Sequence, residues 1–245
     1  MALRAFRFLH RWLLAAIGAA YLLTLGLRSA HHREFLYRIP AKFGYHPTRP
    51  EIPQISMTSI VTGDMDIRLC DPLPTGGEIS LLELVCINAL VSRFQPLRVL
   101  EIGTLGGRTT LNMMANTQPT AEVFTLDLPN TDYLRSGATG QILGRHWMQL
   151  YGDSLTFDFS PLYNSMDFIF IDANHSYEHV RSDSLQALRM LRNKTGVVVW
   201  HDYTSWDWEG NTRALNELYA RNPDFRCLRH IEGTTLVCLL RTPAA

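Results

Sequence analysis

Four short apolar runs, each leading directly into polar residues, constrain the fold of this 245-residue chain more than any other feature. They occupy residues 98–102, 122–126, 166–171 and 196–200. Such runs lack a strict apolar–polar alternation, which is typical of strands that helices cover on both faces. Segments with helical periodicity separate them, over residues 81–93, 108–116, 177–192 and 211–221. The alternation predicts a doubly wound α/β fold built on a mostly parallel sheet.

The remaining segments refine this topology. Residues 146–150 are expected to form a further strand, and residues 131–144 are expected to be helical or irregular. Two last strands, over 225–231 and 235–241, are joined by three residues only. A link this short permits an antiparallel pair but no parallel crossover. A nicotinamide-binding Rossmann domain would instead end in helix-linked parallel strands.

The chain is organised into three predicted regions. Residues 1–30 form a hydrophobic segment, residues 31–75 a proline-rich linker or lid, and residues 76–245 the α/β domain. Ser80 and Glu83 have the spacing of a capping box at the start of the helix over 81–93. A composition of 46% hydrophobic and 19% charged residues is ordinary for a globular protein. The formal net charge of zero argues against a broad nucleic-acid surface.

The cysteines are expected to be reduced core residues. They are Cys70, Cys86, Cys227 and Cys238. No two of them form a C-x-x-C pair, and most lie in apolar runs, where cysteine behaves as a small hydrophobe.

The N-terminus holds the one compositional anomaly. Residues 12–27 carry no charge and follow Arg4, Arg7 and Arg11. Three interpretations stay open: a membrane anchor that includes residues 6–27, a helix lying on a membrane or packing on the domain, and a cleaved secretory signal. Asn174-His175-Ser176 matches the N-glycosylation pattern inside the candidate site described below. That overlap favours a domain facing the cytoplasm, or an organism that does not modify this pattern.

Glycines and a carboxylate at the ends of the first two strands predict a cofactor site. Gly103, Gly106 and Gly107 follow the first strand and would let backbone N–H groups approach a ligand. Leu105 and Arg108 occupy two glycine positions of the dinucleotide pattern G-x-G-x-x-G, which is therefore not met. Asp127 follows the second strand about 20 residues later, where a carboxylate accepts hydrogen bonds from ribose hydroxyls. Together these features favour an adenosine-containing cofactor.

Further polar residues follow the other strands. Asp153 follows the third strand, from which it could reach an adenine edge. Glu101 lies inside the end of a buried strand, so its carboxylate needs a partner. Tyr203, Trp206 and Trp208 would either wall an acceptor pocket or pack over the sheet edge. Helical residues from Tyr177 onward, including Glu178, His179 and Asp183, are interpreted as a charged, solvated helix start.

These residues together resemble a known motif series. The relevant stretches are Glu101-Ile-Gly103-x-x-x-Gly107-Arg-Thr, Thr125-Leu-Asp127-Leu-Pro129, Gly152-Asp153-Ser154, Ile171-Asp172-x-x-His175 and Trp200-His201-Asp202-Tyr203. In this order they resemble class I S-adenosylmethionine-dependent methyltransferases, within the small-molecule O-methyltransferase branch that includes sugar and catechol-type enzymes. The resemblance covers about residues 76–245 and includes the reversed terminal strand.

The resemblance implies roles for the cofactor-binding residues. Glu101, Gly103, Thr104 and Gly107 would bind the methionine portion, and Asp127 the ribose. Asp153 and Ser154 would lie at the adenine region. Asp172 would border the cofactor.

The resemblance also implies a metal. In related enzymes carboxylates at the ends of the fourth and fifth strands hold a divalent ion, so Asp172 and Asp202 are candidate ligands for Mg²⁺ or a similar cation. His201 departs from the pattern, because some relatives have an acidic or amide ligand there and imidazole suits Mg²⁺ poorly.

Methyl transfer to a hydroxyl requires that the hydroxyl lose its proton or be held in line with the methyl group. His175 and His201 are the candidate bases. The sequence thus predicts an enzyme that O-methylates a small hydroxylated acceptor. The alternatives are a nicotinamide-dependent oxidoreductase of related fold and a membrane-tethered, non-catalytic binding module. The oligomeric state is left open by the sequence.

Overall fold

A computed structural model describes most of the chain. The described residues are 12–13, 15–21, 23–24, 48–70, 79–129, 141–142, 145–205 and 207–241. The chain divides into two units, residues 1–47 and 48–245. In the first unit, residues 12–13, 15–21 and 23–24 are helical. Across the described residues, no helix combines the length and apolar character needed to cross a membrane.

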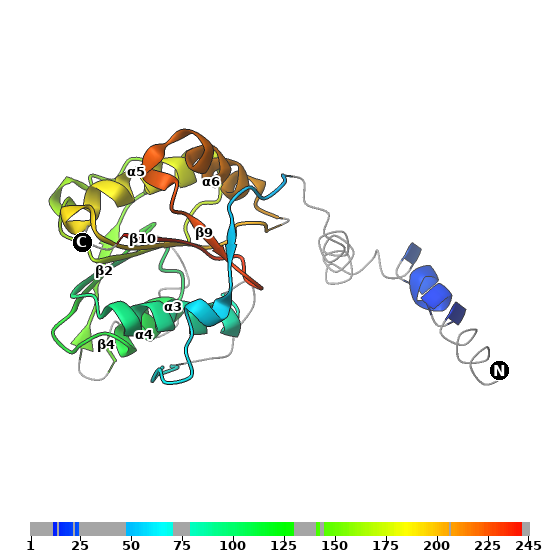
Figure 1. The fold of residues 1–245 in the computed structure, drawn as a ribbon, viewed down its shortest axis with the longest axis horizontal. Coiled ribbons are helices and arrows are strands. Elements are labelled where there is room, and N and C mark those ends of the chain that lie inside the picture. Colours follow the sequence, from blue (N-terminus) through cyan, green and yellow to red (C-terminus); the bar gives the residue numbers. More distant parts are fainter. Residues whose placement is uncertain are drawn as a thin grey trace. The chain divides into compact units, whose positions relative to one another are not determined.

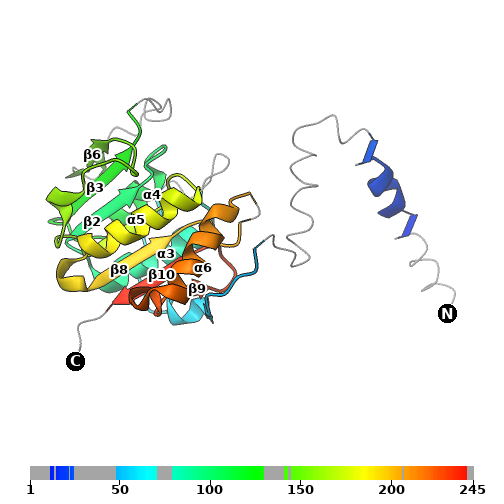
Figure 2. The same ribbon diagram turned by 90° about the horizontal axis from the view of Figure 1, so that it is seen from above.

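The second unit is built on one eight-stranded sheet. Its strands are β1 (Gln54–Ile55), β2 (Arg98–Ile102), β3 (Glu122–Asp127), β6 (Met148–Tyr151), β7 (Phe168–Ile171), β8 (Gly196–Trp200), β9 (Arg229–Ile231) and β10 (Val237–Arg241). They lie in the order β1-β9-β10-β8-β7-β2-β3-β6. Figure 2 shows β6 at one edge and β9 toward the other. The five strands from β8 to β6 in this order are parallel to one another, which confirms the mostly parallel sheet.

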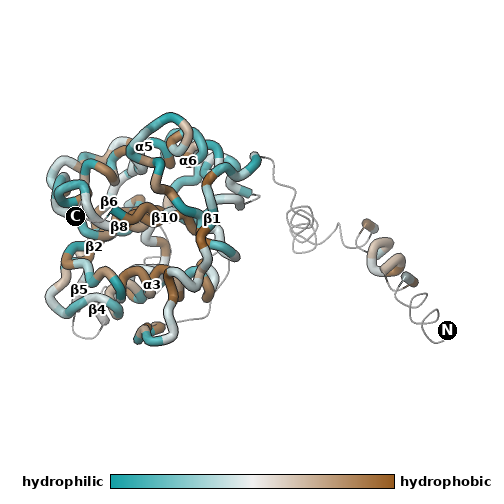
Figure 3. The backbone as a smooth tube through the Cα atoms, in the orientation of Figure 1, coloured by the Kyte–Doolittle hydropathy of each residue, from teal (hydrophilic) through white to brown (hydrophobic). Residues whose placement is uncertain are grey.

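Helices cover both faces of the sheet. They are α3 (Leu81–Phe94), α4 (Arg108–Ala115), α5 (Tyr177–Met190) and α6 (Glu209–Arg221). In Figure 1, α5 and α6 lie on one side of the sheet and α3 and α4 on the other. The apolar strands are brown in the middle of this unit in Figure 3.

The two faces explain why the strands lack alternation in hydropathy. In β7, Phe168 and Phe170 join the core cluster that includes α3 and α4. Ile169 and Ile171 join the cluster that includes α5 and α6. Both faces of the strand are therefore buried, and each position favours an apolar side chain.

The C-terminal strands form the predicted antiparallel pair. β10 runs antiparallel to both β9 and β8. β9 is shorter than predicted, because a 3-10 helix over Pro223–Phe225 precedes it. β1 comes from the predicted proline-rich linker and pairs in parallel with β9 at the edge of the sheet.

The region before β6 differs from the expectation. β4 (Gln141–Ile142) and β5 (Arg145–His146) form a separate antiparallel pair, so residues 141–142 of the segment expected to be helical or irregular are extended, and the strand expected over 146–150 is divided between β5 and β6. The rest of the expected helical or irregular segment, residues 130–140, lies outside the described residues.

An extended segment over residues 66–70 is held by asparagine side chains of α3 and α4. The side chain of Asn116 accepts a hydrogen bond from the Arg68 N–H at 2.8 Å and donates to its carbonyl at 2.8 Å. Asn112 makes the same two kinds of contact with the backbone of Cys70. These amides pair with the backbone as a neighbouring strand would. No local pattern in the sequence indicates this arrangement.

The cysteines are free, but they are not all core residues. Cys86 and Cys238 are buried, whereas Cys227 is exposed and Cys70 is partly buried. Cys227 follows the 3-10 helix and precedes β9, outside the region that strand pairing covers.

Candidate active site

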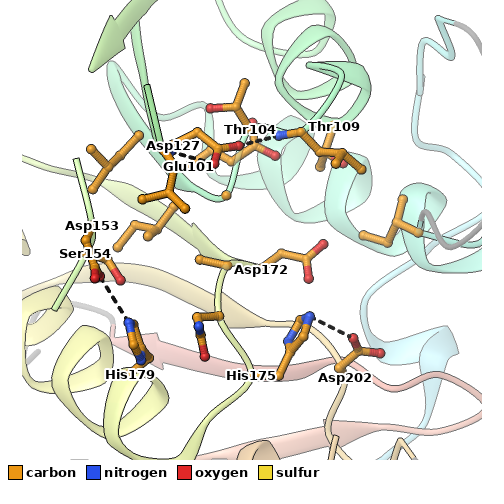
Figure 4. Close-up of a pocket in the computed structure, with 18 of the residues that line it drawn as sticks. Glu101, Thr104, Thr109, Asp127, Asp153, Ser154, Asp172, His175, His179 and Asp202 are labelled. Carbon is orange, nitrogen blue, oxygen red and sulfur yellow. Dashed lines mark hydrogen bonds and ion pairs between the residues drawn. The ribbon is translucent and has the colours of Figure 1, made fainter. Parts of the chain in front are cut away.

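The candidate site lies where the strand order reverses. β2 is followed by β3 on one side in the sheet, while β7 and β8 lie on its other side. Open α/β sheets bind ligands at the carboxyl ends of the strands at such a point. A cavity of about 470 Å³ opens there, lined by residues that follow β2, β3, β6, β7 and β8. Figure 4 shows these residues converging on it.

The glycine loop is shaped by its contact with the neighbouring strand. Gly103 has a φ of +102°, and a Cβ at this position would collide with the carbonyl oxygen of Asp172. Gly107 has a φ of 78° and is the N-cap of α4. Glycine tolerates both the close approach and the left-handed backbone. The loop therefore brings the end of β2 directly against the end of β7.

Glu101 is a buried carboxylate at the cavity wall. It is 1% exposed and lines the cavity. Thr110 on α4 donates a hydrogen bond to it. Burial raises the pKa of Glu101 well above its ordinary value, and the Asp172 and Asp127 carboxylates raise it further, although the Thr110 hydrogen bond acts the other way. A cationic group in the cavity would favour its ionised form.

Asp127 connects the glycine loop to β3. Its carboxylate accepts hydrogen bonds from the backbone N–H of Leu105 at 2.8 Å and of Leu128 at 2.7 Å. Thr104 is also part of this loop, but its hydroxyl lies 2.6 Å from that of Thr125 and accepts from Gln149 at 3.1 Å. The structure thus places Asp127 at the cavity and gives the Thr104 hydroxyl a structural role.

Asp153 and His179 form a pair at one end of the cavity. The Nε2 of His179 lies 3.0 Å from Oδ1 of Asp153, which also accepts from the Leu155 N–H at 3.0 Å. The pKa of Asp153 is lowered, first by the Leu155 hydrogen bond and then by His179. The other ring nitrogen of His179 lies 2.8 Å from the Ser176 hydroxyl.

His179 therefore corrects the interpretation of this helix start as solvated, because it lines the cavity. Asp183 corrects it too, since this residue is fully buried and accepts from the Ser154 hydroxyl at 3.0 Å. Burial raises the pKa of Asp183 to about 6. Ser154, predicted to bind the cofactor, lines the cavity, but its hydroxyl donates its hydrogen bond to Asp183.

His201 lies between carboxylates. Its Nδ1 is 3.1 Å from Oδ1 of Asp172, and its Nε2 is 3.4 Å from Oε2 of Glu83. Burial by itself would lower the pKa of His201, but the neighbouring carboxylates raise it well above the ordinary value. Both ring nitrogens are thus engaged, and a protonated imidazole has no lone pair with which to accept a further proton.

Glu83 reaches this group from α3. It completes the predicted capping box with Ser80. Its other oxygen accepts from the backbone N–H of Thr235 at 2.8 Å and from the Thr235 hydroxyl at 2.7 Å. Burial opposes ionisation, yet hydrogen bonds and the charge of His201 lower the pKa of Glu83 well below its ordinary value. Glu83 is therefore an ionised partner for His201.

His175 and Asp202 complete the cluster. The Nε2 of His175 lies 3.7 Å from Oδ2 of Asp202. The His175 ring packs on Trp208 with centroids 4.5 Å apart. Burial lowers the pKa of His175, which favours the neutral ring. Burial raises the pKa of Asp202 to about 6, while the charge of His201 opposes that rise.

The residues predicted as metal ligands, Asp172 and Asp202, lie close together, and His175 joins them. One ligand atom each from Asp172, His175 and Asp202 fall within 4.8 Å of one another. His201 is engaged by Glu83 and Asp172 instead. Two carboxylates suit a hard divalent cation, so the donor set fits such an ion.

The sequence predicted most of the residues that line the cavity, but not several of the side chains that contact them. Of the predicted aromatics, Trp208 lines the cavity, Tyr203 is buried, and Trp206 lies outside the described residues. Glu83, His179 and Asn211 were not predicted to serve the site. Asn211 follows Trp208 closely on α6, but no pattern of one sequence reveals that its side chain reaches His175.

Comparison with known proteins agrees with this geometry. A protein family described as a methyltransferase domain matches residues 100–203, which run from β2 to the turn after β8. No curated protein sequence matches the chain. The matched domain and the strand order together support an S-adenosylmethionine-dependent methyltransferase. The nicotinamide-dependent alternative receives no support from these matches.

Solved structures share the fold at low identity. The chain is similar to an O-methyltransferase from Bacillus cereus in complex with S-adenosylhomocysteine, at 23% identity over 69% of this chain and 84% of that one, with a TM-score of 0.53. It is also similar to the S-adenosylhomocysteine-bound methyltransferase PaMTH1 from Podospora anserina, at 19% identity over 67% and 80% of the chains, with a TM-score of 0.53. TomG, a Streptomyces achromogenes O-methyltransferase of tomaymycin synthesis solved with S-adenosylmethionine, shares 18% identity over 67% and 82%, with a TM-score of 0.51.

Proposed function

We propose that this protein transfers the methyl group of S-adenosylmethionine to a hydroxyl oxygen of a small acceptor. The observation that carries the proposal is one cavity with two unlike walls. Glu101, the glycine loop and Asp127 line one wall, and Asp172, His175 and Asp202 line the other. A cofactor held by the first wall would lie next to groups that can handle an acceptor proton.

The cofactor would be bound along the wall formed by β2, β3 and β6. Asp127 would accept hydrogen bonds from the ribose hydroxyls, as a carboxylate at the end of the second strand does in related folds. Glu101 would face the ammonium group of the methionine portion, which would stabilise its ionised form. Asp153, fixed by His179, would lie at the adenine end. Structures similar to this chain contain S-adenosylmethionine or S-adenosylhomocysteine, which supports the assignment.

The chemistry requires only one displacement and one proton transfer. The acceptor oxygen forms a bond to the methyl carbon, the carbon–sulfur bond breaks, and S-adenosylhomocysteine leaves as a neutral thioether. The hydroxyl proton would pass to the pair formed by His175 and Asp202. The Asp202 carboxylate has a pKa of about 6, close to the value that favours a base near neutral pH. We assign His201 the role of a fixed cation that holds Asp172 in place, not that of a base.

A divalent cation would fit the same wall. Asp172 and Asp202 would hold it through carboxylate oxygens. When bound, such an ion would lower the pKa of an acceptor hydroxyl and so supply part of the activation. The chain's own residues would still position the acceptor.

Calorimetry and a product screen test this function. We expect the full-length chain to bind S-adenosylmethionine and to add one methylene mass to hydroxylated aromatic or sugar acceptors. Asp172→Asn should abolish the mass gain, while Asp158→Asn, an exposed carboxylate outside the cavity, should leave it unchanged. Absence of cofactor binding by the folded protein would refute the proposal.

We further propose that residues 6–27 associate with a membrane and that the enzyme faces the cytoplasm. The uncharged stretch that follows Arg4, Arg7 and Arg11 supports this proposal.

A further inference from the structure

The start of α6 holds His175 in one orientation. Trp208, the residue before α6, packs against the His175 ring at a centroid distance of 4.5 Å and an interplanar angle of 34°. A Cβ at Gly210 would collide with the His175 carbonyl oxygen, so the backbones are in direct contact there. The start of α6 therefore sets the position of both the ring and the backbone of His175.

Asn211 adds a third contact, which is chemically directional. Its Nδ2 lies 3.1 Å from the backbone carbonyl oxygen of His201 and 3.3 Å from Nδ1 of His175. Asn211 is 3% exposed. A carbonyl oxygen can only accept a hydrogen bond, so it requires the NH₂ end of the Asn211 amide at this place. Turning the amide over would set two oxygens against each other.

This orientation fixes the proton on His175. An amide NH₂ can only donate, so Nδ1 of His175 must accept and carry no proton. In the neutral ring the proton then resides on Nε2, the nitrogen that faces Oδ2 of Asp202 at 3.7 Å. A neutral imidazole carries one proton on one of its two nitrogens, and Nδ1 is already the acceptor.

We infer that Asn211 is a positioning residue that locks neutral His175 in the tautomer with its proton on Nε2. Its catalytic meaning rests on the proposed methyl transfer. His175 presents an N–H and not a lone pair to Asp202, so the proton-accepting atom of this pair is a carboxylate oxygen of Asp202. While the lock holds, Nε2 of His175 is also closed to a metal, so that of the three clustered residues Asp172 and Asp202 remain as ligands.

Nitrogen NMR of the histidine rings tests the tautomer directly and needs neither turnover nor cofactor. The full-length ¹⁵N-labelled protein is measured at about pH 8, where an imidazole of ordinary pKa is neutral. The His175 signals are identified by their loss in His175→Gln. We expect a protonated nitrogen at Nε2 and an unprotonated one at Nδ1; the reverse pattern, or two protonated nitrogens, would overturn the inference.

Variants of Asn211 test its part in the lock. Asn211→Asp replaces the donor by an acceptor of the same shape and should move the proton to Nδ1. Asn211→Ala removes the donor and should give a mixture of tautomers, which keeps the test decisive if the aspartate variant does not fold. Asn216→Asp is the matched control, because this buried asparagine of the same helix bonds Tyr203 and Arg49 and should leave His175 unchanged.

The outcomes separate this inference from the proposed function. An unchanged His175 pattern in both Asn211 variants would refute the lock even if methyl transfer is observed. A protein that binds no S-adenosylmethionine but shows the expected pattern would refute the methyltransferase proposal and leave the lock standing.

Discussion

At the scale of single residues, the site opposes ionisation of the Glu101 carboxyl group, whose pKa burial raises well above its ordinary value. Its side chain is buried, and the neighbouring carboxylates of Asp172 and Asp127 raise its pKa further. In the protein without cofactor, ionisation at this position is therefore unfavourable. An ammonium group placed in the cavity would offset both the burial and the neighbouring negative charges.

Glu101→Gln should make the cofactor-free protein more stable at high pH. Because the folded-state pKa of Glu101 is raised, the unfolded chain loses this proton first, and the wild type loses stability as pH rises above about 4.5. Glutamine cannot ionise, so the gain in melting temperature should be larger at pH 8 than at pH 5. Scanning calorimetry measures it.

The same variant should bind S-adenosylmethionine at least about tenfold more weakly, because it loses a charge-assisted hydrogen bond. Glu122→Gln, at the exposed start of β3, is the control for both measurements. An equal gain in stability at the two pH values would show that the Glu101 proton is not the cause.

Glu83 is a second residue whose role depends on a distant partner. Glu83→Gln should destabilise the protein by about 3 kcal/mol at neutral pH, because it leaves His201 buried with one partner fewer. The folded-state pKa of Glu83 is lowered, so its contribution is present above the ordinary pKa and is lost as pH falls. Urea unfolding at pH 7 and at pH 3.5 should therefore show a smaller difference at the lower pH.

Glu232→Gln, in the exposed turn between β9 and β10, should change stability little at either pH. A difference between Glu83→Gln and wild type that stays constant with pH would argue that Glu83 acts only as a helix cap. The capping box that the sequence predicts is thus only part of what this side chain does.

At the scale of elements, the site depends on how closely the carboxyl ends of β2 and β7 approach each other. Gly103→Ala should destabilise the protein by more than about 1 kcal/mol, because the new Cβ would meet the Asp172 carbonyl and φ is +102°. Gly106→Ala is the matched control, since a Cβ at Gly106 has no neighbouring atom within 4 Å. Equal unfolding midpoints for the two variants would contradict this account of the loop.

At the scale of the whole molecule, the N-terminal segment is expected to place the enzyme at a membrane. The full-length chain should co-sediment with phosphatidylcholine vesicles, and Ile17→Asp should weaken binding on the order of 100-fold, because a buried aspartate costs about 3 kcal/mol. Leu97→Asp, at an exposed apolar position before β2, should bind like the wild type. Equal sedimentation of all three proteins would refute membrane association through residues 6–27.

Local patterns of the sequence predicted the main helices and strands and their order along the chain, but not β1, β4 or β5. Continuous apolar runs give strands wherever helices cover both faces, and a three-residue link between 231 and 235 permits only an antiparallel pair. The carboxyl ends of parallel strands meet at one edge, so Asp127, Asp172 and Asp202 could be assigned to a common site in advance. These inferences succeed because they need only short-range geometry and the common direction of the strands.

Only the tertiary structure decided what each side chain does there. Glu83 precedes His201 by 118 positions, and its spacing with Ser80 fully accounts for a capping box. His179 and Asn211 likewise lie in helices whose local pattern is ordinary, and their partners come from other elements. Hydrogen-bond direction and burial arise when distant segments pack, and they decide that the pKa of His201 is raised while that of His175 is lowered. The sequence by itself therefore determined where the site residues lie, while tertiary packing determined their hydrogen-bond partners and the direction of their pKa shifts.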